Sequence, residues 1–374
     1  MPNVRSLTDS MLDSKWVYHE DHRFYPDGGG IVALPGNGIV APRVQAFLRL
    51  LKAYADRYYS IRKGHESHYE DIFYLARQID DDETDNLDNP AIDGFVREVR
   101  SQASRLLENA NVFGRPEERY GRLAQLACGL IVNVVESRLA TPPVVVGLDL
   151  LRELAIDHDI TCLNVVTLNH DLVVEKYLGD HGLDYVDGFG PDVGGLRRFS
   201  PNLFDAPARI RLLKPHGSVN WHCYSRAEGE NLFAIPIGAT PERVVDPGDV
   251  AWGRIDGPLF LAGTNNKIYD YGVGIFAEQF DRFHRFLSQH DTIIVSGYGF
   301  GDKGINGRFW DWLFGDLSRK LIILHRDPEE LRLGARESFS KMLNTFGREG
   351  RLIVVPKWMQ QTSLDPDLRA IVSR

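Results

Sequence analysis

The sequence predicts an α/β protein: a parallel β-sheet with helices on both faces, and an inserted helical subdomain ahead of it. Three observations support this prediction. From about residue 142 onwards, short apolar runs alternate with helical segments of 10–15 residues, as in βαβ units. Residues 41–140 show helical periodicity with no strand between the helices. Three of the apolar runs end in polar clusters, and the ends of parallel strands are where ligands bind in such sheets.

The composition is typical of a globular protein. Of the 374 residues, 43% are hydrophobic and 25% are charged, which predicts one or two domains. No segment reaches the roughly 20 apolar residues that cross a bilayer, and the N-terminal residues lack the apolar core of a signal peptide. We therefore expect a cytoplasmic protein without a membrane partner. The net charge of −9 does not support binding to nucleic acid.

The cysteines and the paired histidines argue against a metal site. Cys128, Cys162 and Cys223 are widely separated, and without a Cys-x-x-Cys pair they cannot form a structural zinc ribbon or a dense disulfide scaffold. His65 and His68 lie three residues apart on a predicted helix, but no third ligand is identifiable nearby. We expect no bound metal.

The first half of the chain is predicted to be irregular up to about residue 40 and helical afterwards. The irregular part includes a glycine-rich, mobile loop at Pro26–Pro42. Helical spacing and helix-starting prolines predict four helices: Val44–Tyr58, Tyr69–Ile79, Pro90–Leu107 and Pro116–Leu139. The acidic stretch Asp80–Asn89 is predicted to be a solvated loop between them.

Strands begin after Pro142–Pro143. The predicted strands are Thr161–Leu168, Ile210–Leu213, Pro258–Leu261, Asp291–Ser296, Lys320–His325 and Arg351–Val355. The predicted helices are Val146–His158, Leu172–Asp180, Gly274–Gln289, Ile305–Leu317 and Pro328–Phe346. Two long irregular stretches interrupt this pattern, at about Gly182–Ala208 and His222–Gly257, and loops of that length are often functional.

Three strand ends carry different polar residues. The segments are VVTLNHD (Val165–Asp171), IRLLKPHGSVNW (Ile210–Trp221) and TIIVSGYGFGD (Thr292–Asp302). Because the carboxyl ends of parallel strands meet at one edge of a sheet, we expect these residues to form one site.

His216 is the first candidate for chemistry in that site. It follows a strand directly and can take a proton near neutral pH, and Gly217 leaves room for a turn or a ligand. The alternative is a buried histidine bonded to a backbone carbonyl. Asn169 and Asp171 precede a helix, where either is a good N-cap. Since a helix has one N-cap position, Asn169 is the better functional candidate and Asp171 the better cap.

The segment Ser296–Asp302 (SGYGFGD) is a glycine-rich turn between a strand and a helix. Its backbone N–H groups and the positive end of the helix suit a phosphate or a ribose. Asn306 is either a first-turn polar residue or a ligand contact, and Gly263–Lys267 (GTNNK) is either a loop or a ligand contact. Trp310 and Trp312 are expected to pack in the core.

Together these strand ends resemble the sirtuin-like NAD-consuming superfamily, specifically its zinc-free bacterial branch. A segment like TxNxD in that family is matched by Thr167, Asn169 and Asp171. A segment like K-x-HGS is matched by Lys214, His216, Gly217 and Ser218. A segment like SGYSFGD is matched by Ser296, Gly297, Tyr298, Gly299, Phe300, Gly301 and Asp302. The resemblance covers the chain from Thr161 to about Leu317.

The resemblance implies a single sirtuin-like domain over 1–374, with a Rossmann-like core over 141–374 and NAD as the substrate. Asn169 and His216 would be catalytic: Asn169 would position water or the ribose hydroxyls, and His216 would bond to, or deprotonate, a ribose hydroxyl or water. The residues implied to bind NAD are Thr167, Asp171, Gly217, Ser218, Ser296, Gly297, Tyr298 and Asp302. No zinc is expected, because the zinc-dependent deacylases of the superfamily carry two cysteine pairs.

The implied activity is hydrolysis of NAD to nicotinamide and ADP-ribose, as the effector of a bacterial antiphage defence system. The implied partners are a separate sensor protein or ATPase, further copies of the chain in a homo-oligomer, or both. The main alternative is a sensor or assembly subunit that binds NAD or ADP-ribose without cleaving it. An NAD-dependent protein deacylase is a further alternative.

The N-terminus departs from the family pattern. Family members open with a strand and a Gly-Ala-Gly-x-Ser turn that holds the NAD pyrophosphate, followed by a segment like G-x-P-S-V-x-x-L-T. Pro2, Val4, Leu7 and Thr8 match this second segment. We therefore expect the first strand and its phosphate loop to precede Met1.

Overall fold

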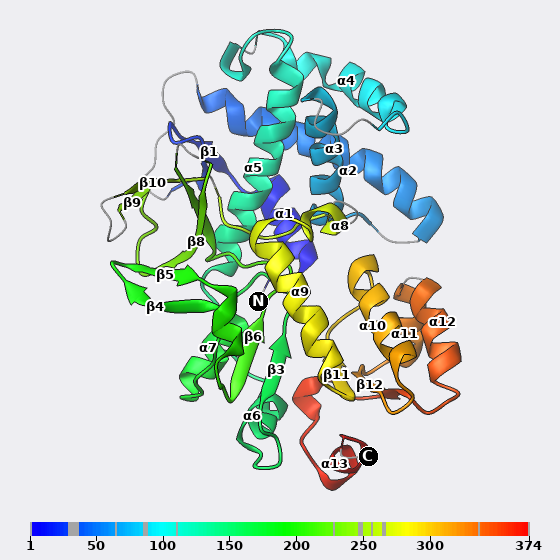
Figure 1. The fold of residues 1–374 in the computed structure, drawn as a ribbon. Coiled ribbons are helices and arrows are strands. Elements are labelled where there is room, and N and C mark those ends of the chain that lie inside the picture. Colours follow the sequence, from blue (N-terminus) through cyan, green and yellow to red (C-terminus); the bar gives the residue numbers. More distant parts are fainter. Residues whose placement is uncertain are drawn as a thin grey trace. The chain divides into compact units, whose positions relative to one another are not determined.

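The computed structural model describes residues 2–28, 37–63, 66–84, 89–109, 111–226, 229–245, 250–255, 257–263, 267–335 and 337–372 (Figure 1). The chain forms two compact units. Unit 1 comprises Met1–Thr141, Ser218–Gly229 and Glu242–Lys267. Unit 2 comprises Pro142–Gly217, Glu230–Pro241 and Ile268–Arg374.

Helices make up most of unit 1. They are α1 (Val4–Asp13), α2 (Val40–Lys63), α3 (Tyr69–Glu83), α4 (Asp93–Leu107) and α5 (Arg119–Leu139), with short 3-10 turns η1 (Asn37–Ile39) and η2 (Asn111–Phe113). Helix α5 packs along α3 and also contacts α1, α2 and α4 (Figure 1). Because α5 is apolar on several sides, it can serve as the centre of this group.

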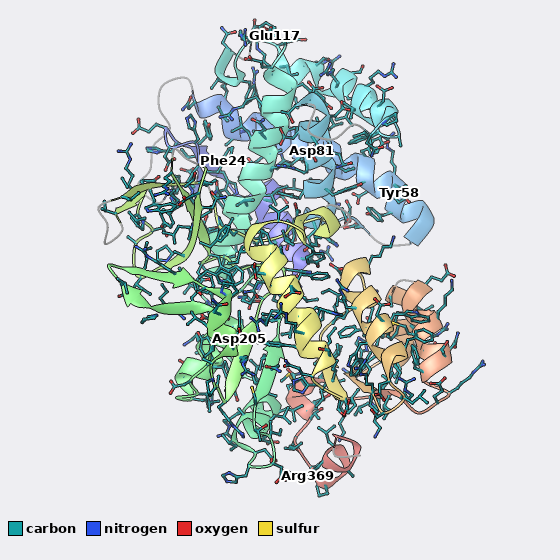
Figure 2. The ribbon with its side chains drawn as sticks, in the orientation of Figure 1. Phe24, Tyr58, Asp81, Glu117, Asp205 and Arg369 are labelled. Carbon is teal, nitrogen blue, oxygen red and sulfur yellow. The ribbon has the colours of Figure 1, made fainter. Side chains whose placement is uncertain are left out.

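The four predicted helices of this region are confirmed by α2 to α5, with two corrections. Helices α4 and α5 each begin three residues later than predicted, and Pro90 and Pro116 lie in the turns just before them. The acidic loop was also wrong at its start, because Asp80 and Asp81 belong to α3 and are buried (Figure 2 labels Asp81). Arg77, one turn earlier, lies 3.5 Å from Asp80 and 3.1 Å from Asp81, so a cation offsets their charge within the helix.

The described residues among the first forty contain more regular structure than predicted. Asn3 caps α1 by accepting a hydrogen bond from the Ser6 N–H at 2.9 Å, and α1 buries one face through Leu7, Met11 and their neighbours. Strands β1 (Trp16–Tyr18) and β2 (Phe24–Pro26) then form an antiparallel hairpin. Residues 29–36 of the predicted glycine-rich loop lie outside the described residues.

Unit 1 also contains three antiparallel strands within the stretch that was predicted to be irregular. They are β7 (His222–Ser225), β9 (Arg243–Val245) and β10 (Ala251–Arg254), with β10 between the other two. The strand predicted at Pro258–Leu261 is absent from this described segment, in which only Phe260 forms an isolated bridge. Strands of three or four residues are too short for alternation to identify them reliably.

Unit 2 contains two parallel sheets, which confirms a mixed α/β class. One sheet pairs β3 (Leu163–Val166) with β6 (Ile210–Leu213), and the other has the order β11 (Thr292–Ser296), β12 (Lys320–Leu324), β13 (Leu352–Val355). The helices around them are α6 (Asp149–Ile156), α7 (Val173–Asp180), α9 (Gly274–Ser288), α10 (Lys303–Gly315), α11 (Pro328–Gly334), α12 (Glu337–Phe346) and α13 (Pro366–Val372). Short helical turns occur at α8 (Lys267–Asp270), η3 (Pro201–Asp205) and η4 (Met359–Gln361). The single helix predicted over Pro328–Phe346 is therefore two helices, α11 and α12.

Helices cover both faces of the β11–β12–β13 sheet. Successive side chains of a strand point to opposite faces. On β12, Leu321 and Ile323 pack with residues of α9, α10 and α12, whereas Ile322 and Leu324 pack with residues of α6 and α13. A sheet buried on both sides explains why its strands read as continuous apolar runs.

The remaining strands of unit 2 are antiparallel, which the predicted all-parallel sheet did not include. Strand β5 (Leu196–Phe199) pairs with β4 (Phe189–Val193) and with β8 (Asn231–Pro236). Gly194 and Gly195, with φ of 65° and 82°, form the turn between β4 and β5. A Gly-Gly pair is a known signal for such a hairpin. The prediction that residues 182–208 are irregular was therefore wrong for β4 and β5. In the described part of the chain, no helix is both long and apolar enough to cross a membrane.

Candidate functional site

The end of β6 places two buried polar side chains in unit 2. Lys214 and His216 are 2% and 4% exposed. The chain turns immediately after them, where the Gly217 N–H donates to the Lys214 carbonyl at 2.9 Å. Gly217 has a φ of 77°, in the left-handed region that favours glycine, so the turn depends on this residue.

His216 is held by a tyrosine and a carboxylate. Its Nε2 lies 2.6 Å from the Tyr271 hydroxyl and 3.3 Å from Oδ2 of Asp302. The Tyr271 hydroxyl donates to the same Oδ2 at 3.1 Å. His216 therefore contacts two polar side chains, Tyr271 and Asp302, at the end of β6.

Tyr271 was not predicted from the sequence. It lies between α8 and α9, is buried, and stacks on Phe280 of α9 with ring centroids 4.0 Å apart and an interplanar angle of 13°. The guanidinium of Arg308 lies 5.0 Å from the centroid of the same Phe280 ring. A tyrosine in a short connection 55 residues after His216 matches no motif, so only the fold identifies it.

Asp302 has two structural tasks. Its Oδ1 accepts from the Ile305 N–H at 3.0 Å, which makes it the N-cap of α10, and its Oδ2 faces His216 and Tyr271. The carboxylate of Asp302 thus connects the strand end after β11 with the strand end after β6, where His216 lies.

The turn between β11 and α10 is open to solvent on its glycine side. A Cβ atom placed on Gly297, Gly299 or Gly301 would meet no atom within 4 Å. Phe300, by contrast, has a left-handed φ of 52°, and its buried ring stacks on Phe339 at 4.0 Å. Packing of the buried Phe300 ring stabilises the strained backbone of the turn. The glycine backbone of the turn faces open space.

Asn306 supports this turn from inside. It is 2% exposed, accepts from the Tyr298 hydroxyl at 2.9 Å, and donates to the Phe300 carbonyl at 2.8 Å. These bonds use its amide within the protein, so the structure favours the structural alternative over a ligand contact for Asn306.

The end of β3 lies beside the end of β6, because the Thr167 N–H donates to the Leu213 carbonyl at 3.0 Å. Asn169 is exposed, and its backbone N–H donates to Oγ1 of Thr167 at 3.2 Å. The Asn169 amide group has no hydrogen-bond partner among the described residues, so it is available to a ligand. Asp171 accepts from the Val173 N–H at 3.0 Å. The N-cap position of α7 is Leu172, which makes no side-chain cap bond, so the prediction of Asp171 as the cap was wrong.

Lys214 connects the first two strand ends. Its ammonium group lies 2.8 Å from Oε1 of Glu175 in α7, and it also donates to the Asp171 carbonyl. His170, next to Asn169, is buried, with its ring centroid 6.2 Å from that of His216. Unit 2 therefore brings residues from all three predicted strand ends together.

Ser218 is the one predicted site residue that belongs to unit 1. It is fully buried, and its backbone N–H donates to the Leu259 carbonyl at 2.9 Å.

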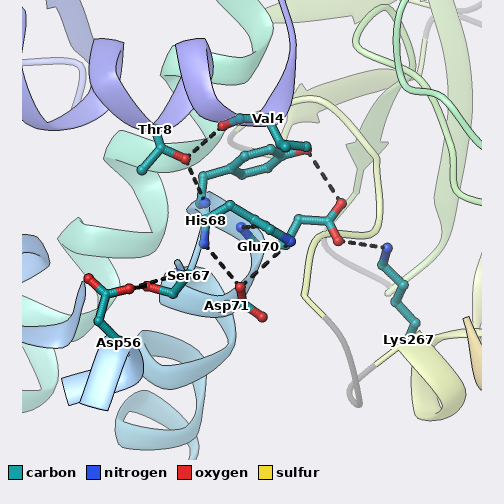
Figure 3. Close-up of polar contacts among 9 residues, drawn as sticks. Val4, Thr8, Asp56, Ser67, His68, Glu70, Asp71 and Lys267 are labelled. Atoms are coloured by element: carbon teal, nitrogen blue, oxygen red, sulfur yellow. Dashed lines mark hydrogen bonds and ion pairs between the residues drawn. The ribbon is translucent and has the colours of Figure 1, made fainter. Parts of the chain in front are cut away.

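The remaining sequence candidates have structural tasks or lie outside the described residues. His68 caps α3, with its ring Nδ1 accepting from the Glu70 N–H at 3.3 Å and its own N–H donating to Asp71 at 3.0 Å (Figure 3). His65 is outside the described residues, as are residues 264–266 of the GTNNK segment. Lys267, which ends that segment, lies 3.4 Å from Glu70 (Figure 3). Across the described ranges, no three His, Cys, Asp or Glu side chains form a group that could hold a metal ion.

The cysteines and tryptophans also have structural surroundings. Burial raises the pKa of the Cys223 thiol to about 11, and burial likewise raises the pKa of Cys128. Both are therefore protonated thiols at neutral pH and poor nucleophiles. Trp312 is buried and donates to the His290 carbonyl at 3.0 Å, while Trp310 packs on Phe346, so the prediction that both pack is confirmed.

The arrangement in unit 2 offers an imidazole backed by a carboxylate, an exposed amide and an open glycine turn. These groups can orient hydroxyls and water and can exchange a proton with them. Comparisons with protein-family models and with curated proteins find no match to this chain.

Proposed function

We propose that this protein is an NAD hydrolase of the sirtuin-like type, built on a Rossmann-like core, which releases nicotinamide and leaves ADP-ribose. The observation that carries the proposal is the Tyr271–Asp302 pair on Nε2 of His216, in the same unit as the exposed amide of Asn169. A buried histidine backed in this way is suited to hold a proton. It adds to the motif resemblance, which placed Asn169 and His216 as the catalytic pair.

The chemistry requires little acid catalysis. The nicotinamide of NAD leaves as a neutral ring from a cationic one, so its departure needs no proton. The transition state is an oxocarbenium-like ribose, as in glycoside hydrolysis. We assign Asn169 to position the attacking water or the ribose hydroxyls. We assign His216 to bond to, and take a proton from, one of these groups, with Asp302 stabilising the protonated ring.

The charge of Asp302 favours a ribose over a phosphate beside the glycine turn. Its carboxylate already caps α10 and would repel a phosphate at that helix end. A ribose presents hydroxyl donors, which carboxylate and carbonyl oxygens accept. We therefore propose that Ser296, Gly297 and Tyr298 contact the adenosine half through its ribose. Thr167, Asp171 and Gly217 complete the proposed set of NAD contacts within unit 2.

Incubation of the purified chain with NAD tests the proposal, with free nicotinamide measured by chromatography. The expected result is release by the wild type and loss of release in Asn169→Ala and His216→Ala. If the protein, supplied with a partner, binds NAD and leaves it intact, the protein is not a hydrolase.

A sensor that binds NAD or ADP-ribose without cleavage is the second candidate. The observation that favours it is that two polar groups are already bonded within the protein: Asp302 caps α10, and Nε2 of His216 contacts the Tyr271 hydroxyl. Calorimetry separates the two functions. Equal binding of NAD and ADP-ribose, with no nicotinamide released, would support the sensor.

We also propose a role as an antiphage effector that works with a separate sensor or ATPase protein, or as a homo-oligomer. This proposal follows from the resemblance of the three motifs. Infection of cells that carry the wild type or Asn169→Ala, with intracellular NAD measured over time, tests it.

A further inference from the structure

Lys214 and Glu175 form a largely buried ion pair at the ends of β3 and β6. Their side chains are 3% and 16% exposed, and the ammonium nitrogen lies 2.8 Å from Oε1 of Glu175. Burying two charges costs desolvation energy, and such a pair often adds nothing to stability compared with apolar residues of similar size. The pair is better explained by its place between the segments that carry Asn169 and His216.

The side chain of Lys214 holds the segment that follows β3. Its ammonium group donates to the Asp171 carbonyl as well as to Glu175 in the first turn of α7. Asp171 lies two residues after Asn169. An ammonium group has three donors, and two of them thus fix the segment that carries the Asn169 amide.

The backbone of Lys214 holds the segment that carries His216. Its N–H donates to Oε1 of the fully buried Gln279 in α9 at 3.1 Å. Its carbonyl accepts from the Gly217 N–H at 2.9 Å and so closes the turn that contains His216. One residue therefore contacts both segments, and Glu175 fixes the charged end of that residue.

The next residue of α9 supports His216 by a second route. Phe280 stacks on Tyr271, whose hydroxyl contacts Nε2 of His216. Neighbouring residues of one helix thus hold the Lys214 backbone and the His216 ring. The Lys214 ammonium group connects the exposed Asn169 to the same framework.

We propose that Lys214 and Glu175 are positioning residues that hold Asn169 at a fixed place relative to His216 during the reaction. This inference rests on the proposed NAD hydrolase function, because it assigns the two residues a task in that reaction. Neither side chain needs to contact NAD. A displacement of about 1 Å in a reacting group can lower the rate about 100-fold. The pair therefore acts on kcat more than on KM.

A double variant separates positioning from stability. Lys214→Met/Glu175→Leu replaces both charges by apolar side chains, so the protein should regain much of the stability that Lys214→Met alone loses. Methionine cannot donate to the Asp171 carbonyl, so kcat for nicotinamide release should stay about tenfold or more below wild type, with KM within about threefold. A kcat that returns to the wild-type value together with stability would overturn the proposal.

Substitutions of Glu175 alone test the second member of the pair. Glu175→Ala should lower kcat about tenfold, whereas Glu175→Gln keeps an acceptor for the Lys214 ammonium group and should recover part of that loss. Asp180→Ala is the matched control, because it removes a carboxylate of α7 that pairs with the more exposed Lys176 at 2.9 Å. Equal kcat values in Glu175→Ala and Asp180→Ala would contradict the positioning role.

Hydrogen exchange tests the proposal without NAD, so its failure can be told from failure of the hydrolase function. In Glu175→Ala, the backbone amides of residues 169–173 should exchange faster than in the wild type, while those of β11 should not change. Unchanged exchange at residues 169–173 would overturn the positioning role whether or not the protein cleaves NAD. Faster exchange there, in a protein that releases no nicotinamide, would support the fixed segment and reject the hydrolase function alone.

Discussion

The hydroxyl of Tyr271 lies 2.6 Å from Nε2 of His216 and donates to Asp302 at 3.1 Å. Tyr271 is a positioning residue for the proposed reaction, since its contact with Nε2 orients the His216 ring.

Tyr271→Phe should lower kcat for NAD cleavage about tenfold and leave KM nearly unchanged, because one orienting hydrogen bond is lost while the ring still stacks on Phe280. Steady-state nicotinamide release measures the effect. Tyr25→Phe, which removes a hydroxyl bonded to Asp21 in unit 1, is the control and should retain full activity. Equal rates in the two variants would show that the contact does not orient His216.

Asp302→Asn and Asp302→Ala separate the two tasks of this residue. Asparagine keeps the cap of α10 but removes the charge beside His216. Its kcat should fall about tenfold, because the carboxylate beside His216 is gone. Asp302→Ala should in addition lose about 1 kcal/mol of unfolding free energy through the missing cap. Identical stabilities of the two variants would contradict the capping task.

Asn169→Ala should reduce turnover by about 100-fold or more, because an exposed amide that aligns the attacking water or ribose contributes only during the reaction. Its unfolding free energy should change by less than about 0.5 kcal/mol, as for other exposed residues. Asn202→Ala, at another exposed asparagine of unit 2, is the matched control. A large loss of stability in Asn169→Ala would indicate a structural residue instead.

Lys214→Met should destabilise the protein by about 3–5 kcal/mol, because it leaves the largely buried Glu175 carboxylate without its cation. Urea unfolding measures the change. Adding Glu175→Leu should recover a large part of the loss, since the unpaired charge is then removed as well. Lys176→Met, which breaks the exposed pair with Asp180, should cost less than about 0.5 kcal/mol.

His222 should make stability depend on pH below about 6.5. Its pKa is lowered to about 4 by burial and by the charges of Arg254 and Arg23, while Glu136 is the nearby carboxylate on α5. Between pH 4 and about 6.5 the unfolded chain binds the extra proton. Stability is therefore full above that range and falls as the pH is lowered through it, by up to about 3 kcal/mol.

Unfolding free energies at pH 7 and pH 5, in wild type and in His222→Gln, check this contribution. The wild type should lose more stability than the variant between the two values. The same loss in both would exclude His222 as the titrating group.

The parts of the fold that local pattern controls were predictable. Strand β6 has the predicted bounds Ile210–Leu213, because a buried parallel strand is a continuous apolar run. The long amphipathic helices α2 and α3 were found from their period. The antiparallel strands were missed, because elements of three to six residues depend on partners that are distant in sequence. The break between α11 and α12 was missed as well.

The candidate site residues that could be predicted from the sequence are those that directly follow a strand. Asn169, His216 and Asp302 follow strands, and the structure places all three in unit 2. Tyr271 and Glu175 reach the site from a connection and from a helix face, and no local pattern marks them. Asn306 shows that a polar residue near a glycine-rich turn need not bind a ligand. Its side-chain amide donates to the Phe300 carbonyl and so stabilises the turn.

The division of the chain between the two units has a consequence for its synthesis. Unit 1 includes Ser218–Gly229 and Glu242–Lys267 in addition to Met1–Thr141, so the polypeptide passes between the units five times. On a ribosome that adds about 5–20 residues per second, α1 to α5 emerge roughly ten seconds before β7 and β10, which complete their unit. Until then unit 1 lacks part of its chain, so neither unit can be produced as a simple terminal fragment.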